Sequence, residues 1–162
     1  MTSPESASRT WSSTLQIRAQ VLVAGGRTID GFLHLLPVAS SHSGPETPGD
    51  LLNRTEQFFP LTDESGDTVF LAKEQTLVVT VAPTLSIHDP DRFNAARNIA
   101  LSLEMVDGSA FTGTVVSELP PDRTRALDYL NHAAGFFALL SPGEIRYVNR
   151  GHIRLATPLD RP

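Results

Sequence analysis

The sequence repeats an ordered set of landmarks, and this repetition constrains the fold more than any other feature. Two glycines five residues apart occur as Gly26 and Gly31 and again as Gly108 and Gly113. A Leu-Pro pair, an Asp-to-Asn tetrapeptide, a double phenylalanine, a glycine and a final proline follow in the same order in both stretches. They are Leu36-Pro37, Asp50–Asn53, Phe58-Phe59, Gly66 and Pro83 in the first, and Leu119-Pro120, Asp128–Asn131, Phe136-Phe137, Gly143 and Pro158 in the second. Internal self-similarity of this kind predicts a tandem duplication.

The duplication divides the 162-residue chain into two units. We expect a flexible N-terminal tail over residues 1–14, a first repeat over 15–83, a turn-rich linker over 84–97 and a second repeat over 98–158. A period of roughly 80 residues is too long for a stacked solenoid. A unit of about 60–70 residues is marginally stable alone, so we expect the two repeats to pack on each other.

Each repeat is predicted to have the element order β-β-α-β-β. Apolar and polar residues alternate over 15–23 and 99–105, which is typical of half-buried strands, and glycine turns then predict hairpins. Thr47-Pro48-Gly49-Asp50 predicts a helix start, with the double phenylalanines on the apolar face of the helix that follows. Two short strands then close each unit. The predicted fold class is α+β, mainly β, with two tandem repeats forming small curved sheets or barrels packed as a pseudo-symmetric pair.

The repeats resemble the Sm-like (LSm) small β-barrel family at two short segments. Val106–Val115 is similar to the family's first motif, in which a polar-Gly turn is followed by an apolar residue and a glycine in a bent second strand. Ile145–Ile153, containing Arg150-Gly151, is similar to the second motif. The first repeat carries the first motif at Gly26–Gly31 but has Lys73-Glu74 in place of Arg-Gly. A helical insertion interrupts the pattern in both repeats.

The resemblance implies RNA binding by rings of subunits, and the charge distribution opposes it. The RNA-binding residues of this alternative are Asn131, Arg146, Arg150, Gly151 and Arg154, with Asn53 and Lys73 as weaker counterparts. The chain has a net charge of −5, with four basic and eight acidic residues in the first repeat and five and six in the second. Affinity for nucleic acid depends on Lys and Arg replacing phosphate counterions, so RNA is the disfavoured partner.

No motif of the sequence predicts catalysis. A nucleophile elbow, a P-loop and a dinucleotide-binding glycine pattern are all missing, and the five histidines show no pair at metal-ligand spacing. His88-Asp89-Pro90-Asp91 could offer oxygen ligands to a cation, but a proline-initiated turn explains it better. We therefore expect no enzyme activity, no catalytic residue, no cofactor and no metal.

Amino-acid composition limits the classes of protein to which this chain can belong. A hydrophobic content of 40% excludes general disorder, and no apolar run approaches the length of a membrane-spanning helix. The absence of cysteine excludes disulfides and fits a reducing compartment, so we expect a cytoplasmic protein with no membrane association. The function predicted is a non-catalytic, bacterial-type interaction module, an adaptor or scaffold for protein partners. An Sm-like RNA-binding regulator is the alternative, and homo-oligomerisation is left open.

Overall fold

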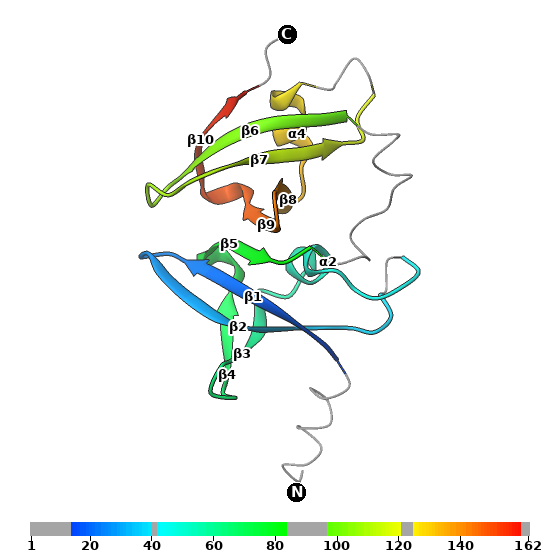
Figure 1. Ribbon diagram of the computed structural model, residues 1–162, viewed down its shortest axis with the longest axis vertical. Helices are drawn as coiled ribbons and strands as arrows, with labels where there is room; N and C mark the ends of the chain where they lie inside the picture. Colours follow the sequence, from blue (N-terminus) through cyan, green and yellow to red (C-terminus); the bar gives the residue numbers. More distant parts are fainter. Residues whose placement is uncertain (1–13, 40–41, 84–96, 121–124, 160–162) are drawn as a thin grey trace, which may run out of the picture.

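The computed structural model describes residues 14–39, 42–83, 97–120 and 125–159, and these residues form one continuous antiparallel sheet of ten strands. The order across the sheet is β10-β6-β7-β8-β9-β5-β1-β2-β3-β4. Figure 1 shows the N-terminal half below and the C-terminal half above, with β5 and β9 meeting between them. The outermost strands of the described sheet are therefore β4 in one half and β10 in the other.

The two halves contain the same elements in the same order. The N-terminal half comprises β1 (Leu15–Val23), β2 (Arg27–Leu35), α2 (Pro48–Asn53), β3 (Phe58–Asp63), β4 (Thr68–Ala72), the 3-10 helix η1 (Lys73–Gln75) and β5 (Thr76–Val81). The C-terminal half comprises β6 (Arg97–Met105), β7 (Ala110–Ser117), α4 (Ala126–His132), β8 (Phe136–Ser141), β9 (Glu144–Asn149), the 3-10 helix η3 (Arg150–His152) and β10 (Ile153–Pro158). The strand order is β5-β1-β2-β3-β4 in the first half and β10-β6-β7-β8-β9 in the second.

Strand register defines which residues hold the same place in the two halves, and we call these counterparts. Ala19 pairs with Gly31 and Val81, while Leu101 pairs with Gly113 and Pro158. A further pair of counterparts is Phe58 and Phe136, which face Ala72 and Asn149 on the neighbouring strands.

Glycines stand where the fold leaves no room for a side chain. Gly26 and Gly108 have φ of 79° and 90° in the two long hairpins, a region that L-residues rarely adopt. Gly31 and Gly113 lie inside β2 and β7, where the next strand crosses closely. A Cβ on Gly31 would clash with Thr62 O, and one on Gly113 would lie 2.6 Å from Leu140 O. A glycine inside a strand is typical of a bulge, a sharp bend or a close backbone approach, and the close approach is present at both glycines.

The predicted fold class is wrong in two respects. The halves are not separate curved sheets or barrels packed as a pair, because β5 pairs directly with β9 and makes one open ten-stranded sheet. Each half also has five strands rather than four, since β3 and β8 lie where the sequence predicted helix. The helices are short, with six residues in α2 and seven in α4.

The double phenylalanines explain the missed strands. Phe58-Phe59 and Phe136-Phe137 open β3 and β8 instead of lying on a helix. Successive residues of a strand point to opposite faces, so Phe59 and Phe137 enter the core while Phe58 and Phe136 point the other way. A helix-spaced apolar pattern over 51–59 had suggested a longer helix, but α2 ends at Asn53 and the chain turns into a strand.

Each hydrophobic core crosses the boundary between the halves. The core of the N-terminal half includes Phe136, Ile145 and Tyr147 from the other half. The core of the C-terminal half includes Leu77 and Val78 from β5. The two halves therefore complete one another's interiors.

Two predicted segments lie almost wholly outside the described residues. Of the tail over 1–14 the structure describes Thr14, and of the linker over 84–97 it describes Arg97, the first residue of β6. No helix among the described residues is long and apolar enough to cross a membrane.

Candidate functional site

The contact between the two halves shows how one sheet edge of this chain receives another. We call it the inner junction: β5, η1 and α2 of the N-terminal half against β8, β9 and η3 of the C-terminal half. Its backbone consists of antiparallel pairing from Val78 opposite Val148 to Val81 opposite Ile145. This pairing satisfies strand edges that would otherwise expose unpaired backbone groups.

Two asparagine amides and a histidine hold the inner junction across its ends. Asn53 donates from Nδ2 to Phe136 O and accepts from Phe136 N at its Oδ1, both at 2.9 Å. On the other side, Asn149 Nδ2 donates to Lys73 O at 3.2 Å and to Thr76 O at 2.9 Å. His152 Nε2 also contacts the carbonyl of Glu74. Side-chain amides thus fix the position of each strand against the other half.

The apolar part of the inner junction is a pair of aromatic rings covered by the opposite half. Phe136 is 6% exposed and Tyr147 is 5% exposed. Helix α2 lies on Tyr147, because a Cβ added to Gly49 would be 3.1 Å from Tyr147 Cε1. Burial, with the Asp50 carboxylate as a second cause, raises the pKa of Tyr147 to about 12. This phenol therefore stays neutral at physiological pH.

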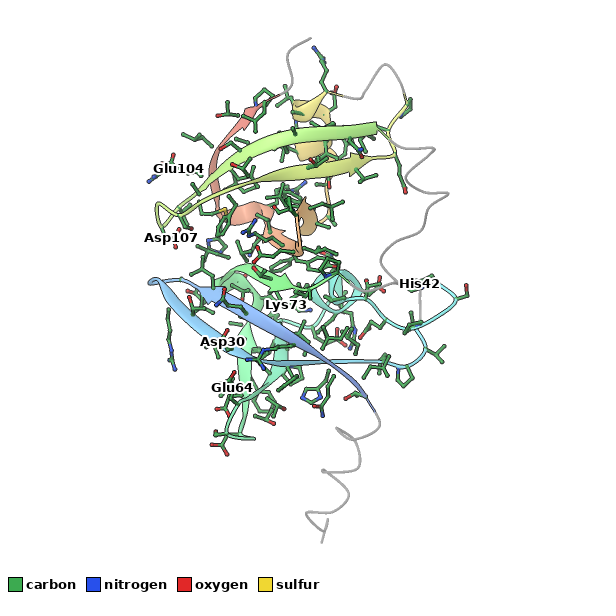
Figure 2. All side chains as sticks on the ribbon, viewed as in Figure 1. Asp30, His42, Glu64, Lys73, Glu104 and Asp107 are labelled. Carbon is green, nitrogen blue, oxygen red and sulfur yellow. The ribbon has the colours of Figure 1, made fainter. Side chains whose placement is uncertain are left out.

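A polar network fixes α2 at the junction. Thr47 and Asp50 form a reciprocal capping box, in which Thr47 N donates to Asp50 Oδ2 at 2.8 Å and Asp50 N donates to Thr47 Oγ1 at 3.1 Å. Burial alone would raise the pKa of Asp50, but hydrogen bonds from Thr47 and His42 lower it. The buried Glu46 carboxylate is paired with the Arg54 guanidinium. Figure 2 shows His42 on the loop beside α2 and Lys73 near the boundary of the halves.

A cavity of about 490 Å³ opens beside α2 at the inner junction. Its walls come from both halves and consist of Ala39, Glu46, Thr47, Gly49, Asp50, Asn53, Arg54, Phe136, Ala138 and Tyr147. Both of its carboxylates are already used, Glu46 by Arg54 and Asp50 by Thr47 and His42. The charged groups of the lining are therefore engaged within the chain.

The surface of the N-terminal half that corresponds to β8 and β9 has aromatic residues at the same two positions, but these residues are exposed to solvent. We call it the outer β4 edge: β3 and β4, with Phe58 and Phe70 on its open face. Phe58, the counterpart of Phe136, is 57% exposed, and Phe70, the counterpart of Tyr147, is 67% exposed. Large aromatic rings this exposed, at diagonal positions on the same face of two paired strands, are typical of a surface that binds a partner.

The opposite end of the sheet is apolar as well. We call it the outer β10 edge: β10 with α4. Leu155 on β10 is 50% exposed, whereas its counterpart Val78 is buried in the inner junction. Leu127 on α4 holds the position of Gly49 and is 65% exposed. Asn131, the counterpart of Asn53, is exposed at the end of α4.

The arginines of the RNA-binding alternative are each engaged within the chain. Arg146 pairs with Glu144 at 2.7 Å and lies over the Phe111 ring, 5.1 Å from its centroid. Arg154 pairs with Glu104 at 3.0 Å. These contacts reduce the positive charge available to a phosphate backbone.

The Arg-Gly pair of the same alternative closes local structure. Arg150 Nη1 donates to Ala133 O at 2.8 Å and to other carbonyls at the end of α4. Its counterpart Lys73 donates to Arg54 O at 3.0 Å, which caps α2 in the same way, and burial lowers the pKa of Lys73. Gly151 N donates to Asn149 Oδ1 at 3.0 Å. The structure therefore brings Asn131 and Arg150 to the end of α4 and leaves Arg146 and Arg154 on separate strands.

Metal-ligating side chains do not gather in the part of the chain that the structure describes. There, no group of three or more His, Asp or Glu side chains could hold a metal ion. The His88-Asp89-Pro90-Asp91 segment lies outside the described residues.

Comparison with protein-family models, with curated proteins and with solved structures found no match.

Sequence reasoning missed the inner junction and the outer β4 edge because it placed Phe136 and Phe58 on helices. The signal that was present is the Phe-Phe dipeptide itself. On a strand, adjacent residues face opposite sides, so one ring of each dipeptide must leave the core of its own half.

Proposed function

We propose that this protein is a non-catalytic interaction module that binds protein chains along the outer edges of its sheet. The observation that carries the proposal is the contrast between counterparts. Phe136 and Tyr147 are covered at the inner junction, whereas Phe58 and Phe70 are open to solvent. The same kind of surface is thus present twice and covered once, which supports a partner for the second.

The composition of β4 supports the same function. Natural sheets protect exposed edges with charged residues, prolines or bulges, because an open strand recruits other strands. The sequence of β4 is Thr-Val-Phe-Leu-Ala, which contains no charge and no proline. An unprotected edge flanked by aromatic side chains suits binding by strand addition, in which backbone hydrogen bonds supply affinity and side chains supply specificity.

We also propose that the two halves arose by duplication and are related to the Sm-like family. The repeated order of elements and the matched crowding at Gly31 and Gly113 support a duplication. The relation to the Sm-like family has less support than the duplication, because it rests on the short motifs around these glycines and around Arg150-Gly151. The cytoplasm is the compartment most compatible with a chain that has no cysteine, so we propose a cytoplasmic location.

The experiment is a cross-linked pull-down with the tagged full-length chain, performed with and without nuclease. The wild type is compared with Phe70→Glu on the outer β4 edge and with Val38→Glu as the control. Val38 is 73% exposed and lies outside both edges, so it matches Phe70 in exposure and in the charge introduced. We expect protein partners that survive nuclease, are lost with Phe70→Glu and persist with Val38→Glu. Partners that nuclease removes, or that bind both variants equally, would contradict the proposal.

A further inference from the structure

We propose that the partner is a second copy of this chain, whose outer β10 edge docks on the outer β4 edge in the arrangement of the inner junction. This inference rests on the proposed function and names its partner. At the inner junction, the edge formed by β5 and α2 covers β8 and β9. The counterparts of β5 and α2 are β10 and α4, and the counterparts of β8 and β9 are β3 and β4. Each copy therefore carries both surfaces of a further junction of the same kind.

The inner junction sets the strand register of the outer one. Val79 lies opposite Tyr147 and Thr80 lies opposite Arg146. Replacing each residue by its counterpart places Ala156 of one copy opposite Phe70 of the next, and Thr157 opposite Val69. A slip of one residue would turn every side chain to the wrong face, so the proposal predicts this register and no other.

The apolar residues match at the positions that the register brings together. Leu155 holds the place of the buried Val78, and Phe70 holds that of the buried Tyr147. Leu127 holds the place of Gly49, where a Cβ would already lie 3.1 Å from Tyr147 Cε1, so α4 must lie slightly farther from the Phe70 ring than α2 lies from Tyr147. Leu155, Leu127, Phe58 and Phe70 are all strongly exposed in a single copy. Docking would remove them from water together, and burial of apolar surface is the main driving force for association.

Asn131 supplies the directional contact. Its counterpart Asn53 holds the backbone N–H and C=O of Phe136 with two hydrogen bonds. In the outer junction the same geometry directs the amide of Asn131 to the backbone N–H and C=O of Phe58 in the next copy. The exposed Asn131 side chain thereby gains a function in protein recognition, in place of the RNA contact that the family resemblance implied.

The loss of an amide also makes the outer junction weaker than the inner one. Asn149 donates two hydrogen bonds across the inner junction, but its counterpart on the outer β4 edge is Ala72. The outer junction keeps the strand pairing, the apolar contacts and the Asn131 contact, and it lacks this second amide. Association should therefore be reversible and depend on concentration. Because the two surfaces differ, the contact is head-to-tail and builds closed rings or open chains.

The test is sedimentation of edge variants of the full-length chain, alone and mixed. Phe70→Glu disables the outer β4 edge, Leu155→Glu disables the outer β10 edge, and Val38→Glu is the control. We expect the wild type and the control to associate as concentration rises from the micromolar to the millimolar range. Each edge variant alone should stay monomeric. A mixture of the two should form a one-to-one dimer and nothing larger, because one intact edge of each kind remains. A wild type that stays monomeric, or a mixture in which the variants do not meet, would overturn the inference.

Asn131→Ala distinguishes the specific hydrogen bonds of this side chain from nonspecific hydrophobic association. Loss of both hydrogen bonds should weaken association by roughly tenfold or more, while the melting temperature of the dilute protein stays unchanged. Association that is insensitive to Asn131→Ala would overturn the role of this residue. The proposed function fails separately from this inference. A chain that is monomeric when pure but still loses protein partners with Phe70→Glu keeps the function and loses the second copy as the partner.

Register can be read directly by cross-linking, because the natural chain has no cysteine. Thr157→Cys protein mixed with Val69→Cys protein should form a mixed disulfide under mild oxidation. The matched control replaces Val69→Cys with Thr68→Cys, one residue along the strand, where the side chain points to the other face. Efficient cross-linking of the first mixture and not the second is the expected result. Equal cross-linking of both, or cross-linking of the second alone, would overturn the proposed register.

Discussion

Asn53 and Phe136 are 83 residues apart in sequence, and the amide of one holds both backbone groups of the other at 2.9 Å. Asn53 ends α2 in the N-terminal half, and Phe136 begins β8 in the C-terminal half. This side chain therefore joins the end of α2 in the first half to the start of β8 in the second. The same residue type recurs at Asn131, where the described chain offers no second half to hold.

The first prediction compares these two asparagines. Asn53→Ala leaves the N–H and C=O of Phe136 without their partners, so we expect the free energy of unfolding to fall by about 1–3 kcal/mol. Asn131→Ala should change it by less than about 0.5 kcal/mol in dilute protein, as for an ordinary surface substitution. Urea denaturation of both variants measures the difference. Equal effects would show that Asn53 does not hold the inner junction.

The second prediction concerns the crowded glycines. Gly113→Ala places a Cβ 2.6 Å from Leu140 O, and backbone cannot move aside as a flexible side chain can. We expect a loss of about 1–3 kcal/mol in the free energy of unfolding, and a similar loss for Gly31→Ala. Gly135→Ala is the control, because its nearest neighbour is Asn53 Oδ1 at 3.7 Å. A control as damaging as Gly113→Ala would contradict the explanation by close approach.

The third prediction is that neither half is stable alone. Leu77 and Val78 of β5 lie in the core of the C-terminal half, and Tyr147 lies in the core of the N-terminal half. Fragments 1–83 and 98–162 should therefore be poorly folded. Phe137→Ala should destabilise the whole chain by about 3–5 kcal/mol. Denaturation of the full chain and both fragments, followed by circular dichroism, provides the measurement. Fragments that unfold cooperatively with the stability of the intact protein would contradict the shared interior.

The fourth prediction concerns His34, which is buried between two threonine hydroxyls. Its ring nitrogens lie 3.0 Å from Thr14 Oγ1 and 2.7 Å from Thr62 Oγ1, and burial lowers its pKa below 6.5. The unfolded chain then binds the proton more readily, so stability should fall as pH drops from about 6.5 through the pKa of the folded state. His34→Gln should remove this part of the pH dependence. Unfolding curves between pH 7 and pH 5 that are identical for wild type and His34→Gln would refute it.

The fifth prediction is weak binding to RNA. Arg146 and Arg154 are already paired with carboxylates, and the chain is acidic overall. We expect affinity for a mixed RNA pool to be worse than micromolar at physiological salt, since nonspecific affinity comes mainly from phosphate contacts. Fluorescence anisotropy across a salt series measures it. Tight, salt-sensitive binding that disappears with Arg150→Glu would favour the RNA-binding regulator instead.

Local chemistry accounts for what the sequence predicted well. Gly25-Gly26 and Asp107-Gly108 mark the two long hairpins, because their turns need positive φ. The capping box at Thr47 and Asp50 marks the start of α2 for a similar reason, since both hydrogen bonds form within one turn. These signals lie between residues close in sequence and need no knowledge of the rest of the chain.

Tertiary contacts account for what the sequence could not predict. The apolar spacing over 51–59 fits a helix as well as it fits a short helix followed by a strand, and the pairing of β3 with β2 and β4 decides between them. The pairing of β5 with β9 joins residues about 70 positions apart, with no local signal. Phe58 and Phe136 are the same residue type in similar local sequence, and only the position of the second half makes one exposed and the other buried.

Hydrogen exchange of the wild-type chain as a function of concentration tests the central claim most directly, because it reports on both outer edges without any substitution. The claim is that β4 and β10 are interaction edges and meet each other in successive copies. It predicts that amides of both Thr68–Ala72 and Ile153–Thr157 become more protected as concentration rises, together and over the same range, while those of the solvent-facing β1–β2 turn do not. Exchange at both strands that is independent of concentration, or protection of one strand without the other, would contradict the account.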